Sequence, residues 1–210
     1  LGLAELRAAG FLPGALVNFL ARMGHYYGHD EYRTLDELAG EFAVDRLSRA
    51  PAGYDDARLL YWQKEAVAHA DHDELWAWVG AEVRERVPEA EREAFIAAIR
   101  DNVQMPADAE DWARIFYDDL TLDAEARDVV QDAGGEFFLA AVEALALHGT
   151  DFKAFADEVK QRTGTKGRAL FMPLRAALTG QTQGPVMGAM LPLIGAERAR
   201  RRLEVWVSSD

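Results

Sequence analysis

The chain has 210 residues, half of them hydrophobic, and it contains no cysteine. These values exclude a disordered chain, a disulfide scaffold and any site built on thiolates, and the length is sufficient for a hydrophobic core. The formal net charge of −13 argues against a nucleic-acid partner until it is divided by region. Residues 1–150 hold 13 basic and 30 acidic side chains, whereas residues 151–210 hold 10 basic and 6 acidic ones. An acidic body with a basic tail region is a compositional indication of function.

Apolar runs such as Phe137–Ala141 are far shorter than the roughly 20 residues that span a bilayer. The chain opens at Leu1, without methionine and without a signal-peptide pattern, and we interpret it as part of a longer protein. The absence of cysteine fits a reducing compartment. We therefore expect a cytoplasmic location and no membrane partner.

The hydrophobic pattern in the first half is helical. Pro13 predicts a helix that Gly24 ends, and Thr34 with Glu37 forms a capping-box pattern before the next helix. Asp55 predicts the start of a further helix. After it, the pattern predicts helices over 74–83, with Asp71 or Asp73 as cap, and over 89–102, and Pro106 is expected to break the pattern before a helix over 111–117.

The second half is punctuated by glycine. Gly134 and Gly135 separate predicted helices over 123–132 and 136–147, and Asp151 is expected to cap the following one. Further glycines divide the tail into four short helices. The sequence thus predicts an all-α protein, an elongated array of ten to twelve short helices. We divide it provisionally into residues 1–66, 67–122 and 123–210.

Two histidine clusters are candidates for a metal-dependent hydrolase. His25 and His29 are four residues apart, and His69 and His72 lie beside aspartates. Gly24 and Gly28 favour a loop around the first pair, and a helix end with an aspartate cap explains the second. We therefore assign no metal site.

Arginines and lysines concentrate in the last 60 residues. Arg168 and Arg175 share a face if one helix runs over 168–178, and four arginines follow between positions 198 and 202. Guanidinium groups bind phosphates and stack on bases, but arginine also complements helix ends. The residues alone leave contact with nucleic acid and a structural role equally open.

Two long motifs identify a family resemblance. Residues 10–24, GFLPGALVNFLARMG, resemble the segment that follows the KMSKS-type loop of bacterial glutamyl-tRNA synthetases, and the pattern continues through Thr34–Leu38, Phe42–Ser48, Pro51 and Tyr54-Asp55. Residues 170–180, LFMPLRAALTG, resemble the P-L-R-x-A-L-T-G signature of the same family, followed by Gly184-Pro185 and residues 193–203. Tyr61-Trp62-Gln63 departs from the usual Trp-x-Asn.

The resemblance implies a class I synthetase that joins glutamate to tRNA(Glu) with ATP and Mg²⁺. Its catalytic domain would lie upstream in the same chain, so this part would contain no catalytic residue and no cofactor and would be inactive alone. Residues 1–66 would end the stem-contact region, and 67–122 and 123–210 would be two anticodon-binding helical domains. We expect a monomer.

The resemblance also implies the residues that bind RNA. The candidates for contact with the anticodon are Arg175, Gly184, Pro185, Met187, Asn102 and Arg100, and those for contact with the RNA backbone are Lys166 and Arg168. The alternative is a helical protein-interaction module that docks a basic partner on its acidic face and has no RNA role. It would gain support if Arg168, Arg175 and Arg202 lay on different faces.

Overall fold

The computed structural model describes residues 2–49 and 53–208, which form two compact units. The N-terminal unit comprises Leu1–Gly80 and Arg100–Ala109, and the C-terminal unit comprises Ala81–Ile99 and Glu110–Asp210. Pro51, part of the family motif, lies outside the described residues. Because the chain passes between the units more than once, each unit is built from separate segments of sequence. The division at 66 and 122 concerns roles in recognition and stays a prediction.

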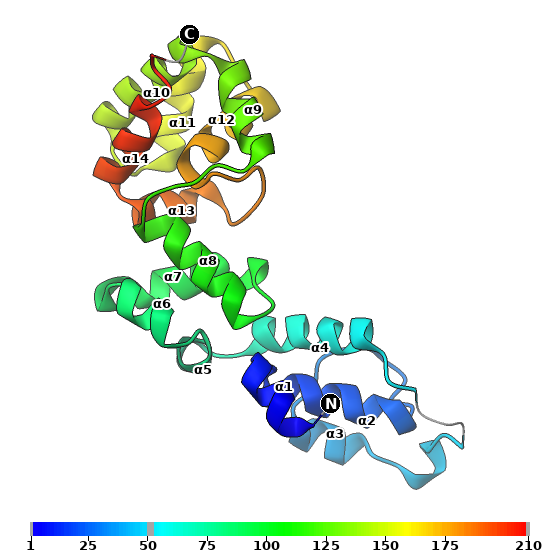
Figure 1. Ribbon diagram of the computed structural model, residues 1–210. Coiled ribbons are helices and arrows are strands. Elements are labelled where there is room, and N and C mark those ends of the chain that lie inside the picture. The colour runs from blue at the N-terminus through cyan, green and yellow to red at the C-terminus, as the bar shows by residue number, and fades with distance from the viewer. Residues whose placement is uncertain (1, 50–52, 209–210) are drawn as a thin grey trace. The chain divides into compact units, whose positions relative to one another are not determined.

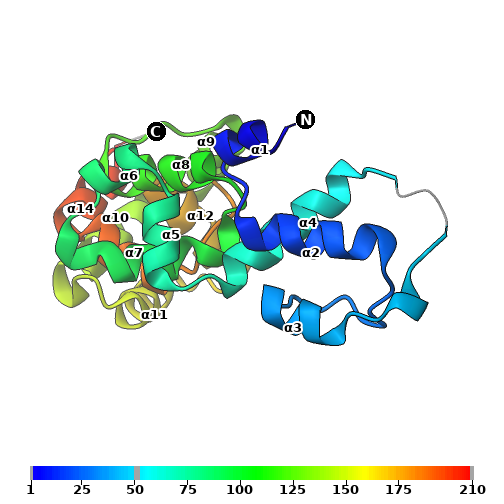
Figure 2. The ribbon, with the colours of Figure 1, turned by 90° about the horizontal axis from the view of Figure 1, so that it is seen from below.

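The N-terminal unit is organised around helix α2. Figures 1 and 2 show α2 lying between α3 and α4, and it packs against both. The α-helices of this unit are α1 (Leu3–Ala9), α2 (Pro13–Gly24), α3 (Leu35–Glu41), α4 (Asp56–His69) and α5 (His72–Trp78), with short 3₁₀ helices at Val44–Arg46 and Arg100–Asn102.

A buried glutamine joins the separate segments of the N-terminal unit. The Gln63 amide nitrogen on α4 donates hydrogen bonds to the carbonyl oxygens of Gly10 (3.2 Å) and Gln104 (3.0 Å). Its amide oxygen accepts one from the backbone N–H of Leu12 (2.9 Å). Gln63 belongs to the Tyr61-Trp62-Gln63 stretch that departs from the family's Trp-x-Asn pattern. Its side chain has a structural role, because it joins α4 to the α1–α2 turn and to the segment 100–109.

The C-terminal unit is a helical bundle with a phenylalanine-rich core. Its helices are α6 (Ala81–Arg86), α7 (Arg92–Ile99), α8 (Pro106–Tyr117, which begins in the N-terminal unit), α9 (Ala124–Ala133), α10 (Gly135–His148), α11 (Phe152–Thr163), α12 (Arg168–Thr179), α13 (Met187–Ile194) and α14 (Ala196–Glu204), with a 3₁₀ turn at Glu89–Glu91. Helix α10 packs on α11 and α14, and α9 packs on α12 (Figure 1). Phe95, Phe116, Phe138 and Phe155 are almost fully buried.

The all-α fold class is confirmed: the described residues contain fourteen α-helices and no strand. Fourteen exceeds the ten to twelve predicted, partly because Gly80 has a φ of +89° and separates α5 from α6, where one helix was expected. The predicted helix over 89–102 is α7 flanked by two 3₁₀ turns. Pro106 does not break a helix; it is the first residue of α8, where its missing N–H costs nothing. None of the described helices has the length and apolar character needed to span a membrane.

Candidate nucleic-acid interface

Arg175 lies on α12 and is half-buried. One of its terminal nitrogens, Nη1, donates a hydrogen bond to the carbonyl oxygen of Pro185 (2.9 Å). Burial lowers the pKa of Arg175, and no acidic side chain among the described residues forms an ion pair with it. A partly desolvated guanidinium without a counter-charge is suited to an anionic or base-edge ligand.

The segment that follows α12 returns to Arg175. Gly184 has a φ of +142°, and a Cβ placed on it would lie 2.2 Å from Cη2 of the Trp112 indole on α8. Glycine is therefore required here, both by the backbone conformation and by the close approach to the ring. Trp112 is 7% exposed, so its indole is a fixed support. The structure thus brings Arg175, Gly184 and Pro185 together on a support, Trp112, that no local sequence pattern indicates.

The other candidates are placed differently. Met187 is the first residue of α13 and only 5% exposed, so its side chain belongs to the core. Lys166 and Arg168 are exposed on either side of Gly167, where α12 begins, and neither pairs with an acidic group in the described chain.

Arg100 and Asn102 belong to the N-terminal unit. Asn102 is exposed, and Arg100 donates from Nη1 to the carbonyl oxygen of Ala68 (3.3 Å). This pair is therefore a separate candidate contact.

Two arginines of the basic tail serve the fold. Arg202 on α14 is 7% exposed and donates to the carbonyl oxygens of Leu178 (2.6 Å), Ile115 (2.7 Å) and Asp118 (2.9 Å), and Arg198 donates to those of Phe116 (3.1 Å) and Ile194 (2.6 Å). Burial lowers the pKa of Arg202 to about 10, which leaves it charged at neutral pH. These side chains satisfy carbonyls at the C-terminal ends of α8, α12 and α13. Arg202 is therefore excluded from the exposed basic surface.

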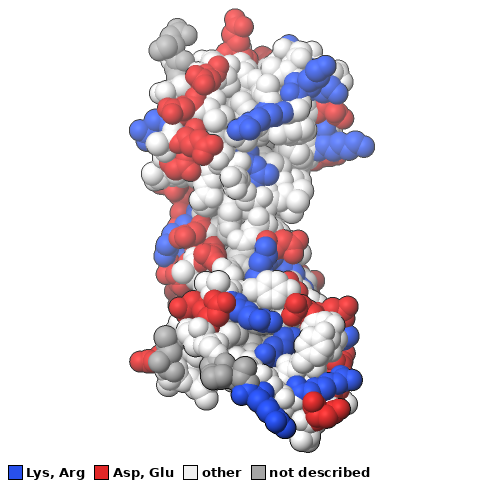
Figure 3. Space-filling view, turned by 90° about the vertical axis from the view of Figure 1, so that its right-hand side faces the viewer, with Lys and Arg blue, Asp and Glu red and all other residues white. Residues whose placement is uncertain are grey.

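Exposed basic side chains are dispersed. On the face shown in Figure 3, lysines and arginines stand among acidic and uncharged residues and do not form one continuous patch. Several exposed arginines of the C-terminal unit are neutralised: Arg162 pairs with Glu158 (2.7 Å) and Glu143, and Arg200 pairs with Glu204 (2.6 Å). Candidate RNA contacts are therefore sought among the cations that are not neutralised in this way.

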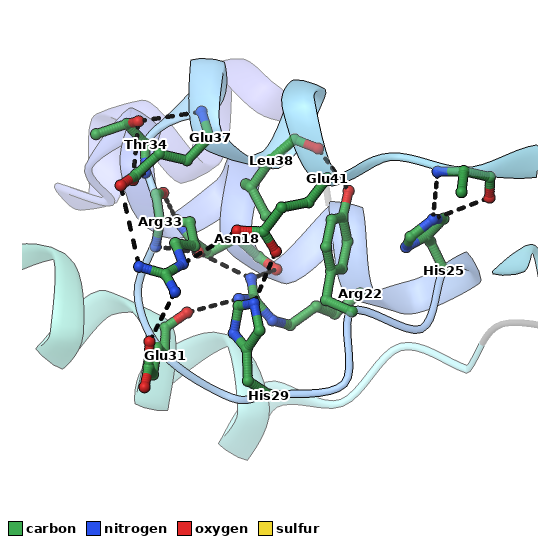
Figure 4. Close-up of polar contacts among 12 residues, drawn as sticks. Asn18, Arg22, His25, His29, Glu31, Arg33, Thr34, Glu37, Leu38 and Glu41 are labelled. Carbon is green, nitrogen blue, oxygen red and sulfur yellow. Dashed lines mark hydrogen bonds and ion pairs between the residues drawn. The ribbon is translucent and has the colours of Figure 1, made fainter.

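Three of the four candidate histidines have partners within the fold. Figure 4 shows His25 and His29 directed to different partners: His25 Nε2 lies 3.1 Å from the carbonyl oxygen of Ala43, and His29 Nε2 lies 2.7 Å from Glu41. His69 Nδ1 lies 2.8 Å from the carbonyl oxygen of Glu65. No group of three or more potential metal ligands occurs among residues 2–49 and 53–208. The metal-dependent hydrolase has no support in these positions.

Residues 64–207 match a family model described as an anticodon binding domain. The chain belongs to the anticodon-binding domain family. The match spans the C-terminal unit almost entirely, including Arg175 and the segment that returns to it. It supports the RNA-recognition interpretation, and no such support exists for the acidic docking module.

The curated relatives of this chain are named as glutamate–tRNA ligases. It is 46% identical over 201 residues to "Glutamate--tRNA ligase 2" of Nitrosococcus oceani, covering 95% of this chain and 43% of the relative. It is 44% identical over 200 residues to "Glutamate--tRNA ligase 1" of Methylococcus capsulatus, with 95% and 43% covered. The chain thus spans less than half the length of these relatives and matches their C-terminal part.

The fold is also found in solved structures. A glutamate tRNA ligase from Elizabethkingia meningosepticum, crystallised in complex with its amino acid, superposes with a TM-score of 0.81 at 17% identity. The superposition covers 97% of this chain and 42% of that one. At this identity the likeness concerns the fold, and it agrees with the all-α arrangement.

Proposed function

We propose that this chain is the tRNA-recognition part of a glutamate–tRNA ligase and that its C-terminal unit contacts the anticodon of tRNA(Glu). The observation that carries the proposal is Arg175, a half-buried cation without an acidic partner among the described residues. It lies beside Gly184 and Pro185 within the region that matches the anticodon-binding family. The names of the relatives supply the amino acid.

The roles of the segments are part of the same proposal. Residues 1–66 end the stem-contact region, and 67–122 and 123–210 are the two anticodon-binding helical domains. Met187 would meet RNA only through its backbone, because its side chain is buried. Lys166 and Arg168 would contact the RNA backbone, and Arg100 with Asn102 another part of the anticodon.

The catalytic chemistry belongs to a preceding domain. The whole enzyme would join glutamate to tRNA with ATP and Mg²⁺ as a cytoplasmic monomer. We place the sites for ATP and Mg²⁺ in that preceding domain. This chain would supply binding and would not charge tRNA alone.

The N-terminal unit has an apolar face suited to that preceding domain. Leu20 on α2 is 54% exposed and Leu3 on α1 is 69% exposed. Both line a hollow of about 320 Å³ whose walls are apolar or aromatic: Leu3, Leu6, Leu16, Phe19, Leu20, Met23, Tyr54 and Leu59. Exposed apolar patches mark interaction sites. The chain matches the C-terminal part of the relatives, so their remaining length precedes the matched region. Helix α1, which contributes to this face, is the first helix of the matched region.

Aminoacylation by the full-length protein tests the proposal. We expect glutamate to be attached to tRNA(Glu) in the presence of ATP and Mg²⁺. Arg175→Ala should raise the KM for tRNA about tenfold or more, because the loss of a charge-assisted contact to RNA weakens binding. The KM for ATP should not change. Absence of charging, or an unchanged KM for tRNA in the variant, would contradict the proposal.

A further inference from the structure

The segment between α12 and α13 has a fixed starting point. Thr179, 1% exposed, donates from its hydroxyl to the carbonyl oxygen of Arg175 (2.8 Å) and lies 3.2 Å from the carbonyl oxygen of Gln181. The hydroxyl oxygen also accepts from the backbone N–H of Gln181 (3.3 Å). The carbonyl oxygen of Gly180 accepts from the backbone N–H of Asp123 (3.1 Å). These hydrogen bonds fix the direction in which the segment leaves α12.

Its other end is fixed as well. Gly184 packs on the Trp112 indole, and the carbonyl oxygen of Pro185 accepts the hydrogen bond from Arg175. Between the two fixed ends stand three residues, 181–183. Their backbone is thus held next to Arg175 without any contribution from their own side chains.

The side chains of Gln181, Thr182 and Gln183 are uncommitted. Gln183 is exposed and the other two are partly exposed. Within the described part of the chain, these three side chains form no hydrogen bond and no ion pair. A backbone fixed at both ends that presents free amide groups, in the same segment whose Pro185 carbonyl contacts the Arg175 guanidinium, is a suitable arrangement for reading a ligand.

The chemistry of the amide selects the ligand. A glutamine side chain offers both donors and an acceptor and carries no charge. Phosphate contacts position RNA, whereas base edges carry its sequence, and unpaired bases are read through hydrogen bonds to their edges. Neutral amides are thus better suited to base edges than to phosphates.

We propose that Gln181 and Gln183 hydrogen-bond to the edge of one unpaired anticodon base beside Arg175 and determine which base is accepted. The inference rests on the proposed function, which assigns RNA to this site. It adds two specificity-determining residues that the family motif does not include. Trp112 and Thr179 are positioning residues, because they act on the base only through the backbone of this segment.

The experiment measures binding of the full-length protein to tRNA(Glu) transcripts with the native anticodon or a single substitution at each anticodon position. The variants are Gln181→Ala, Gln183→Ala and the double variant. The matched control is Gln161→Ala, an exposed glutamine on α11. We expect the double variant to lose about tenfold of the preference for the native base at one position. The slope of log K against log[salt] should not change, because no cation is removed.

The outcomes separate this inference from the function on which it rests. If the wild-type protein discriminates between the transcripts and Arg175→Ala weakens binding, but the double variant discriminates as well as Gln161→Ala, the inference is wrong and the function stands. Equal binding of all transcripts by the wild-type protein would overturn both. Thermal melting checks that the variants are folded, which we expect because these side chains support no internal contact.

Discussion

Arginine has two distinct roles in the C-terminal unit. Arg202 is enclosed, and its guanidinium donates to three backbone carbonyls: those of Leu178 near the end of α12, Ile115 near the end of α8 and Asp118 just after α8. Arg175 donates one hydrogen bond, to the carbonyl oxygen of Pro185 (2.9 Å), and remains partly exposed with no acidic partner among the described residues. Both residues are arginines of the basic tail and both lie on helices, so residue type and position in the chain do not distinguish them. Only the packing around them separates the structural arginine from the candidate RNA ligand.

Replacement of Arg202 should destabilise the C-terminal unit. Arg202→Leu leaves the carbonyls of Leu178, Ile115 and Asp118 without their donor in a buried environment. We expect a loss of about 3 kcal/mol in the free energy of unfolding, measured by urea denaturation. Arg201→Leu is the matched control, because Arg201 is exposed on the same helix, and it should change stability by less than about 0.5 kcal/mol. Equal effects of the two variants would contradict the structural role of Arg202.

Substitution of Gly184 should affect both stability and RNA binding. In Gly184→Ala the new methyl group meets the Trp112 ring, and alanine does not tolerate a φ of +142°. We expect a loss of about 1–3 kcal/mol and weaker tRNA binding, because the segment moves away from Arg175. In Gly188→Ala the Cβ enters open space within α13, so stability and binding should stay at least at the wild-type level. Calorimetry and filter binding compare the two variants.

At the scale of elements, α6 and α8 are joined by charged groups. Glu82 on α6 accepts hydrogen bonds from Arg114 Nη2 (2.7 Å) and Nε (3.1 Å), and it also lies 3.3 Å from Arg86 Nη1. The hydrogen bond from Arg114 is the largest effect on the pKa of Glu82, and together with the charges of Arg114 and Arg86 it lowers this pKa against the opposing effect of desolvation. The ionised carboxylate is thus the form that holds the two helices together.

The lowered pKa of Glu82 predicts a pH dependence. A carboxyl whose pKa is lower in the folded state contributes stability above its ordinary pKa of about 4.3, and this contribution is lost as the pH falls through the folded value. Glu82→Gln should therefore melt below the wild-type temperature at pH 7, with the difference closing as the pH falls below 4. Glu85→Gln, at an exposed position of α6, should show no such convergence. A difference for Glu82→Gln that is constant with pH would contradict this account.

Helix boundaries were predictable where they depend on neighbouring residues. Thr34 accepts from the backbone N–H of Glu37 (3.3 Å) while Glu37 accepts from that of Thr34 (2.7 Å), as the capping-box pattern predicts. Asp151 likewise caps α11. Pro106 was misassigned because proline both ends helices and begins them, and its neighbours do not decide between the two.

The candidate site was predictable only where its residues are neighbours in the sequence. Arg175, Gly184 and Pro185 were found because they stand in a contiguous motif. Trp112 is 72 residues away from Gly184 in sequence, and no local pattern indicates that its indole supports that glycine. For Arg202 the sequence left RNA contact and a structural role equally open, because its burial depends on the packing of α8 and α12 around it. Contacts between segments that are distant in the sequence cannot be predicted from residue spacing or composition.

At the scale of the whole molecule, the charge is divided unevenly along the chain, and this division is compatible with RNA contact through the basic segment. The candidate contacts of the C-terminal unit lie in residues 151–210, where basic side chains outnumber acidic ones, although the chain carries −13 overall. Because the proposed contacts involve cations, binding of tRNA should weaken steeply as the salt concentration rises.

The acidic remainder of the chain would repel RNA from other surfaces. Charge reversal of acidic residues between 55 and 132 should therefore increase nonspecific RNA binding in gel-shift assays.

The most direct measurement is the affinity of the full-length protein for tRNA(Glu) with native and substituted anticodons, for the wild type, Arg175→Ala and Arg201→Ala. We predict that the wild type prefers the native anticodon and that Arg175→Ala loses about tenfold or more in affinity together with much of this preference. Arg201→Ala, which removes an exposed cation of the same unit, should keep the preference. Equal affinity of the wild type for all anticodons, or identical behaviour of the two variants, would contradict anticodon recognition at Arg175.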